Sequence, residues 1–214
     1  KSLETSVFHE TDRRAFGDDY LLKSTPTIQN LIGNSKVSVV VIKALCESQY
    51  IPKLLTTLAP AKSIWMVRHY NDVANSMAQS FPRQKSLMLR IKKDINTGGW
   101  RTRDMSEAIY TDISDLISES MSAGSAAALQ WYFRNMLFFE NHLDKNDNVL
   151  LVFYEDLVAS PQSLFNQISE FVGIRNTPFM TKHIHADSFK RNPAPEISDE
   201  IRLRCDNLWQ RLRE

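Results

Sequence analysis

Apolar and polar positions along the chain predict an alternation of strands and helices. Three runs have the length and near-continuous apolar character of strands that are buried in a parallel sheet. They are residues 37–43, 62–68 and 149–154. Helical periodicity follows each run, and turn or capping residues predict where these helices begin and end. The predicted helices are residues 48–58, 71–80 and 161–172, the last ending at Gly173.

The segment between the second and third strands is predicted to be mainly helical. Two longer helices are expected at residues 106–120 and 126–143, and a final helix at residues 197–212. There is no internal repeat and no low-complexity tract, so residues 1–214 are predicted to form a single domain. The fold class is α/β, a parallel β-sheet flanked by helices on both faces.

The amino-acid composition limits the kinds of partner that the protein is expected to bind. Lys and Arg number 26 and Asp and Glu 25, so the net charge of +1 favours neither nucleic acid nor an anionic membrane surface. No apolar run approaches the ~18 residues expected of a membrane span. Two cysteines, Cys46 and Cys205, are too few for a disulfide framework, and they favour a reducing cytoplasm. The pair His183 and His185 lacks a third ligand nearby, so no metal is expected.

Candidate chemistry lies where the predicted strands end. Lys43 and Arg68 end two strands and Tyr154 ends the third, and ligands of open parallel sheets bind at the carboxyl ends of strands. Two cations and an aromatic ring suit a nucleotide with phosphates and a base. Ser76 lies in the helix after Arg68 and adds a hydroxyl donor. The alternative is that the strand-end charges are solvated and that Arg68 pairs with Asp72.

Four segments carry a resemblance to sulfotransferases that use 3′-phosphoadenosine 5′-phosphosulfate (PAPS), closest to the bacterial-type branch. KSIWMVRHYNDVANS (62–76) resembles the 3′-phosphate-binding segment of that family, in which a Ser lies eight positions after a strand-ending Arg. VLLVFYEDLVASPQSLFNQISEFVGI (149–174) resembles its strand, YEDL turn and helix, and HADSFKRNP (185–193) its later Ser-Phe segment. VVVIKALCES (39–48) matches a strand that ends in Lys.

The resemblance implies a P-loop NTPase-like sulfotransferase fold and a role for several residues. Arg68 and Ser76 would hold the 3′-phosphate of the nucleotide. The other implied nucleotide-binding residues are Tyr154, Ser188 and Phe189 near the adenine, and Lys190 or Arg191 over the phosphates. For Tyr154 a buried structural role, and for Lys190 and Arg191 a solvated pair, are the alternatives.

The family's first strand and phosphate loop have no counterpart in the sequence, and we expect that they precede Lys1. Many members carry a histidine two positions after the strand-ending Lys, whereas this chain has Leu45. The resemblance therefore points to another base. Glu10 is the first candidate and His9 the second, and the alternative is that both lie in a solvated loop. Lys43 would face the transferred sulfuryl group or the acceptor.

The sequence thus predicts a PAPS-dependent sulfotransferase that sulfates a hydroxyl or amine of a small molecule or carbohydrate, without a metal. A basic stripe between residues 83 and 103 could guide an anionic polysaccharide, or it is a solvated helix face. Two other readings stay open: a nucleotide-binding or interaction module without turnover, and a P-loop kinase-like phosphotransferase. Acceptor identity and oligomeric state are open as well.

Overall fold

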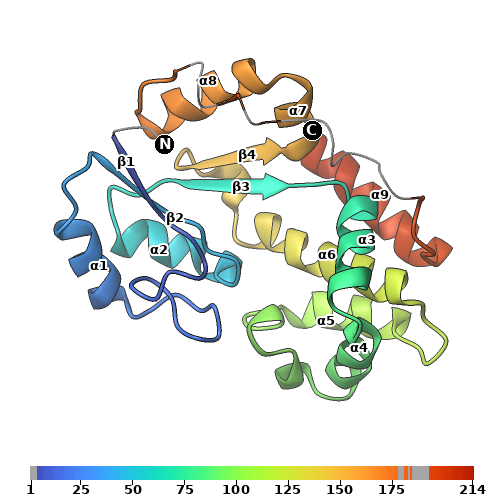
Figure 1. Ribbon diagram of the computed structural model, residues 1–214. Helices are drawn as coiled ribbons and strands as arrows, with labels where there is room; N and C mark the ends of the chain where they lie inside the picture. The colour runs from blue at the N-terminus through green and yellow to red at the C-terminus, as the bar shows by residue number, and fades with distance from the viewer. Residues whose placement is uncertain (1–3, 178–180, 183, 185–192) are drawn as a thin grey trace. The chain divides into compact units, whose positions relative to one another are not determined.

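The computed structural model describes residues 4–177, 181–182, 184 and 193–214 (Figure 1). The chain falls into two compact units. The first consists of Lys1–Trp65, Lys145–Val152 and Asp156–His185. The second consists of Met66–Asp144, Phe153–Glu155 and Ala186–Glu214.

The first unit has a small parallel sheet and a core of its own. Strand β1 (Thr5–Phe8) pairs in parallel with β2 (Val39–Ile42). The helices α1 (Thr25–Gly33) and α2 (Ile51–Thr57) belong to this unit, and a 3-10 turn, η1 (Ser48–Tyr50), precedes α2. Side chains of the loop after β1 pack with β1 and α1, and the buried members of this core are Phe8, Ala15, Phe16 and Ile28.

A second two-stranded sheet pairs β3 (Ser63–Val67) with β4 (Val149–Phe153). Figure 1 draws the two strands as arrows that run in the same direction. Trp65 and Val67 of β3 are buried while Met66 between them is exposed, which is the alternation expected of a strand with one covered face. The short helix α7 (Tyr154–Ala159) and the helix α8 (Pro161–Val172) follow β4.

The second unit is mainly helical and is built around α6 (Ala123–Glu140). Nearly all residues in the first half of α6 are buried, since α3, α4, α5 and α9 all pack against it. These helices are α3 (Tyr70–Ser80), α4 (Gln84–Lys93), α5 (Glu107–Leu116) and α9 (Asp199–Arg213), and two 3-10 segments are η2 (Ile95–Arg101) and η3 (Leu143–Lys145). Gly124 is required in α6 because a Cβ there would lie 2.4 Å from the carbonyl oxygen of Glu196.

The α/β class with parallel strands and flanking helices is confirmed, although the described strands form two small sheets rather than one. Helix α8 has the predicted bounds, because Pro161 begins it and Gly173, at φ 77°, ends it in the left-handed region. The helix predicted at 106–120 was wrong at its end, since α5 stops at Leu116. Strand β1 and helices α1 and α7 were not predicted.

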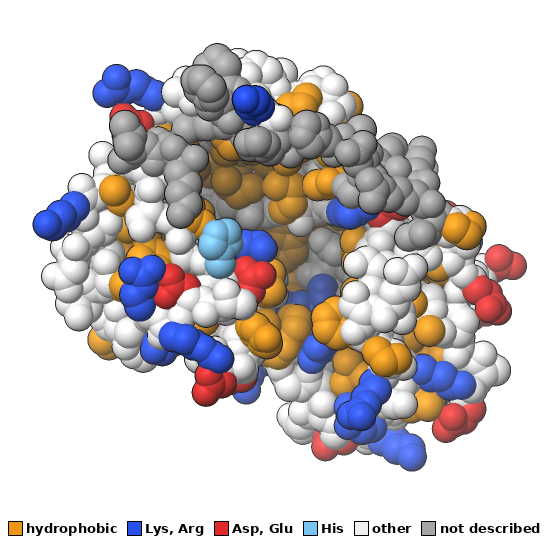
Figure 2. All heavy atoms as spheres, in the orientation of Figure 1, with side chains coloured by type: hydrophobic (Ala, Val, Ile, Leu, Met, Phe, Trp, Pro, Cys, Tyr) orange, Lys and Arg blue, Asp and Glu red, His pale blue; other side chains and the backbone are white. Residues whose placement is uncertain are grey.

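Charges of both signs are interspersed on the surface. In the described part of the face in Figure 2, Lys and Arg side chains lie among Asp and Glu side chains, in keeping with the net charge of +1. None of the described helices combines the length and the apolar character that crossing a membrane requires.

Candidate functional site

Arg68 follows β3 directly and is held in place at its backbone and its side chain. The indole Nε1–H of Trp131, on α6, donates a hydrogen bond of 2.9 Å to the carbonyl oxygen of Arg68. The guanidinium group donates to one carboxylate oxygen of Asp72, with Nη2 at 3.0 Å and Nε at 3.3 Å. The ion pair that the sequence offered as an alternative is therefore present. It leaves the guanidinium group partly exposed, at 28% for the Arg68 side chain.

The ring of Tyr154 lies against the same guanidinium group. The Cζ atom of Arg68 is 4.8 Å from the centroid of the Tyr154 ring, within the range of a cation–π contact. Tyr154 is the residue directly after β4. Two strand-end residues that lie far apart in the sequence are thus in contact with each other.

Glu155 fixes the loop that carries Arg68, a role that sequence reasoning missed. The backbone N–H of His69 donates a hydrogen bond of 2.8 Å to Glu155 Oε1. The Nδ1 atom of His69 accepts a hydrogen bond from the backbone N–H of Asn71 and so caps α3. Because Glu155 is next to Tyr154 in the chain, the contact with His69 restrains the spacing of the Tyr154 ring from Arg68. The YEDL segment was the only sequence signal for it.

Helix α3 begins directly after this loop. The partial positive charge at its N-terminus favours an anion there, while the backbone N–H groups of Asn71, Asp72 and Val73 already donate to His69. Asp72 lies in that turn and Ser76 lies one turn later on the same face, exposed to solvent. Ser76 therefore lies on the helix face that carries the partner of Arg68.

Lys43 and Glu10 form the other pair that the structure brings together, within the first unit. The Nζ atom of Lys43 lies 3.2 Å from each carboxylate oxygen of Glu10. A hydrogen bond from its own backbone N–H, together with Lys43, holds the pKa of the Glu10 carboxyl below its ordinary value, although desolvation opposes this. His9 is exposed beside Glu10. Glu10 is thus ionised at neutral pH and able to accept a proton.

Four of the predicted nucleotide-binding residues lie outside the described residues. They are Ser188, Phe189, Lys190 and Arg191.

Part of the basic stripe has a structural role. The Nζ atom of Lys92 donates a hydrogen bond of 2.7 Å to the carbonyl oxygen of Ile117, and Lys85 donates to that of Glu119. Both carbonyls follow the C-terminus of α5, where cations are stabilising. These two lysines therefore act in packing α4 against the end of α5.

Both cysteines are buried and free of disulfide bonds. Burial raises the pKa of the Cys205 thiol to about 12. Such a thiol is protonated at neutral pH and is a poor nucleophile.

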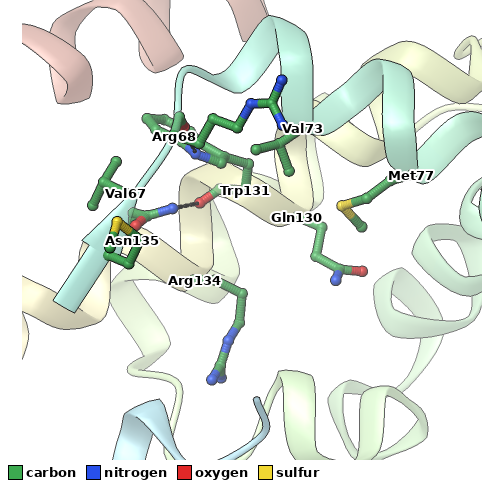
Figure 3. Close-up of a pocket in the computed structure, with 9 residues that line it drawn as sticks. Val67, Arg68, Val73, Met77, Gln130, Trp131, Arg134 and Asn135 are labelled. Atoms are coloured by element: carbon green, nitrogen blue, oxygen red, sulfur yellow. Dashed lines mark hydrogen bonds between the residues drawn. The ribbon is translucent and has the colours of Figure 1, made fainter. Parts of the chain in front are cut away.

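A cavity of about 250 Å³ lies beside Arg68, between α3 and α6 (Figure 3). The sequence did not predict this cavity. The one available signal was a polar residue, Gln130, inside the apolar run from Ala126 to Trp131. The lining residues are Met66, Val67, Arg68, Val73, Met77, Gln130, Trp131, Arg134 and Asn135.

Comparisons with known proteins give one family. The family model described as "Sulfotransferase domain" matches residues 28–207. Among solved structures, the sulfotransferase domain from the curacin biosynthetic pathway is similar at 17% sequence identity and a TM-score of 0.48. The match covers 85% of this chain and 68% of that one. No curated protein sequence matches the chain.

Proposed function

Because this chain belongs to the sulfotransferase domain family, whose members are transferases of sulfuryl groups, we propose that its donor is PAPS. The acceptor provides a hydroxyl or an amine. The products are the sulfated acceptor and 3′-phosphoadenosine 5′-phosphate (PAP).

The arrangement of Arg68 and Tyr154 carries this proposal. A guanidinium group presents a planar set of donors that suits phosphate oxygens, and a tyrosine ring gives a base a surface to stack on. The two groups lie 4.8 Å apart next to the first turn of α3, which itself attracts anions. A nucleotide with a phosphate on its ribose fits this set better than one without it. Ser76 adds a hydroxyl on the same helix face.

The transfer step is an in-line displacement at sulfur. The acceptor oxygen or nitrogen forms a bond to sulfur as the bond from sulfur to the 5′-phosphate oxygen breaks, and the bonding electrons leave with PAP. Glu10 takes the acceptor proton, which requires hydrogen-bond reach in the complex. Lys43 holds the Glu10 carboxylate in place and stabilises negative charge on the sulfuryl oxygens.

The low pKa of Glu10 has a consequence for this step. A carboxylate with a pKa below its ordinary value is ionised over the whole neutral range but is a weak base. Glu10 therefore contributes most where proton transfer is late, after the sulfur–acceptor bond has begun to form and the acceptor has become acidic. Movement of Lys43 from Glu10 toward the sulfuryl group would raise the pKa of Glu10 at that moment.

Calorimetric titration with PAP, 5′-AMP and ATP–Mg²⁺ tests the proposed donor. We expect PAP to bind at least tenfold more tightly than 5′-AMP, since the 3′-phosphate adds a charge-assisted contact of about 1.5–3 kcal/mol. Tighter binding of ATP–Mg²⁺ would instead support a phosphotransferase. Absence of binding by all three, in a folded protein, would support a module without turnover.

A further inference from the structure

The cavity beside Arg68 is built from two helices of the second unit. Val73 and Met77 lie one turn apart on α3, and Gln130 and Arg134 lie one turn apart on α6. Residues at this spacing share a helix face. The two faces border an open space of about 250 Å³, a volume somewhat below the range of pockets that hold drug-sized ligands.

Gln130 carries the inference. Its side chain extends from α6 into the space beside Met77 in Figure 3, and the residue is only 7% exposed. Its Oε1 atom is buried and accepts no hydrogen bond from the described residues. A buried polar atom without a partner is costly and is rare in folded proteins. A carboxamide that lines a cavity in this state is suited to a ligand that supplies the missing partner.

The remaining lining restricts the chemistry of that ligand. Met66, Val73, Met77 and Trp131 present apolar surface, which favours an apolar body. Arg68 and Arg134 also line the cavity, and two cations disfavour an ammonium group.

Arg134 is turned toward backbone carbonyls. Its Nη1 donates to the carbonyl oxygens of Arg101 at 3.1 Å and Trp100 at 3.4 Å, and its guanidinium carbon lies 5.1 Å from the Trp100 ring centroid. These contacts fix the guanidinium group against η2. The carboxamide of Gln130 is therefore the polar group of the cavity that is best placed to form a hydrogen bond with a ligand and so to determine specificity.

We propose that this cavity is a binding site for a small, uncharged, mainly apolar alcohol. A hydroxyl donates the hydrogen bond that the buried Oε1 atom of Gln130 does not receive from the described residues, which an ether oxygen cannot do. The apolar body of the alcohol packs on Met66, Val73 and Met77. The cavity lies within the second unit, so the proposed ligand does not depend on the proposed sulfotransferase function.

Methionine methyl groups report on the cavity without any need for activity. We would label the methionine methyls with ¹³C and add 3-phenylpropan-1-ol, its methyl ether or 3-phenylpropanoate. The alcohol should shift the signals of Met66 and Met77, while Met88, buried in α4 outside the cavity lining, serves as the control. The ether keeps the apolar body but cannot donate a hydrogen bond. The carboxylate tests whether the two arginines select an anion instead.

Gln130→Leu removes the polar group at similar size. We expect it to weaken the alcohol about fivefold or more, the loss of roughly one neutral hydrogen bond, and to leave the ether no weaker than before. Val73→Phe fills the cavity and should abolish the shifts from both ligands. Unchanged methyl signals of Met88 would show that each variant is folded.

The outcomes separate this proposal from the proposed function. Equal binding of alcohol and ether by the wild type, unchanged alcohol affinity in Gln130→Leu, or tighter binding of the carboxylate would each overturn the proposed ligand class. PAP binding with no shift from any of the three probes would also overturn it, and would leave the sulfotransferase function standing. Alcohol binding that depends on Gln130 in a protein that fails to bind PAP would support the cavity and overturn the proposed donor.

Discussion

Replacement of Arg68 by alanine should weaken binding of PAP but leave binding of 5′-AMP nearly unchanged. A charge-assisted hydrogen bond contributes about 1.5–3 kcal/mol, which corresponds to a loss of roughly 10- to 150-fold in PAP affinity. The lower part of that range is expected, because Arg68 already donates two hydrogen bonds to Asp72 in the free protein. Phosphate binding must share or replace those bonds.

The local backbone should survive this substitution. Trp131 donates to the carbonyl oxygen of Arg68, and Glu155 accepts from the backbone N–H of His69, so neither contact involves the Arg68 side chain. The loss in Arg68→Ala therefore reports on the guanidinium group itself. Arg83→Ala, at an exposed arginine before α4, removes the same charge elsewhere and is the matched control.

Calorimetry with PAP and 5′-AMP, on the wild type and on each variant, gives a thermodynamic cycle. The cycle isolates the part of the binding free energy that depends on the 3′-phosphate. Asp72→Asn provides a second arm: it removes a competing negative charge and should tighten PAP binding without affecting 5′-AMP. Equal losses for PAP and 5′-AMP in Arg68→Ala would refute the reasoning. They would mean that Arg68 acts by placing the Tyr154 ring and not by contact with the phosphate.

Four further predictions follow from single contacts. Tyr154→Ala should weaken the binding of PAP and of 5′-AMP equally, by about 1–3 kcal/mol, the contribution of a stacked base, whereas Tyr154→Phe should bind both nucleotides as the wild type does. Calorimetry measures both affinities, and a loss confined to PAP would contradict this prediction. Glu10→Gln should lower kcat by about 10²–10⁴-fold with PAP affinity unchanged, and a larger loss in His9→Asn would assign the base to His9 instead. Gln130→Leu should raise the free energy of unfolding by about 1–3 kcal/mol in urea titrations, since it removes a buried oxygen that accepts no hydrogen bond from the described part of the chain. Destabilisation would count against this assignment of the oxygen. Hydrogen bonds from Arg14 lower the pKa of Asp12 from 3.8 to about 2. The stability that this pair contributes is therefore complete above pH 3.8 and is lost as the pH falls toward 2. NMR of the carboxyl group measures the pKa of Asp12, which should return toward its ordinary value in Arg14→Ala.

The sequence by itself predicted most helices and strands, and the positions of individual candidate residues, because both depend on interactions between neighbouring residues. Pro161 and Gly173 set the bounds of α8 through backbone geometry alone, which depends only on neighbouring residues. The positions of Lys43, Arg68 and Tyr154 directly after strands followed from where apolar runs stop. Strand β1 escaped prediction because four residues with a single buried side chain carry too little pattern.

Contacts between distant segments were decided only by the tertiary structure. Glu155 lies 86 residues from His69, and Trp131 lies 63 residues from Arg68, so no local pattern indicates that they meet. The side chains of Glu155 and Trp131 bind backbone groups of His69 and Arg68 because buried backbone N–H and carbonyl groups require hydrogen-bond partners, and the packing of the chain decides which side chains are near enough. The same packing buries Gln130 beside a cavity, where its Oε1 atom accepts no hydrogen bond from the described residues. The sequence shows only a polar residue in an apolar helix, and the neighbouring helix α3 makes it a candidate for ligand binding.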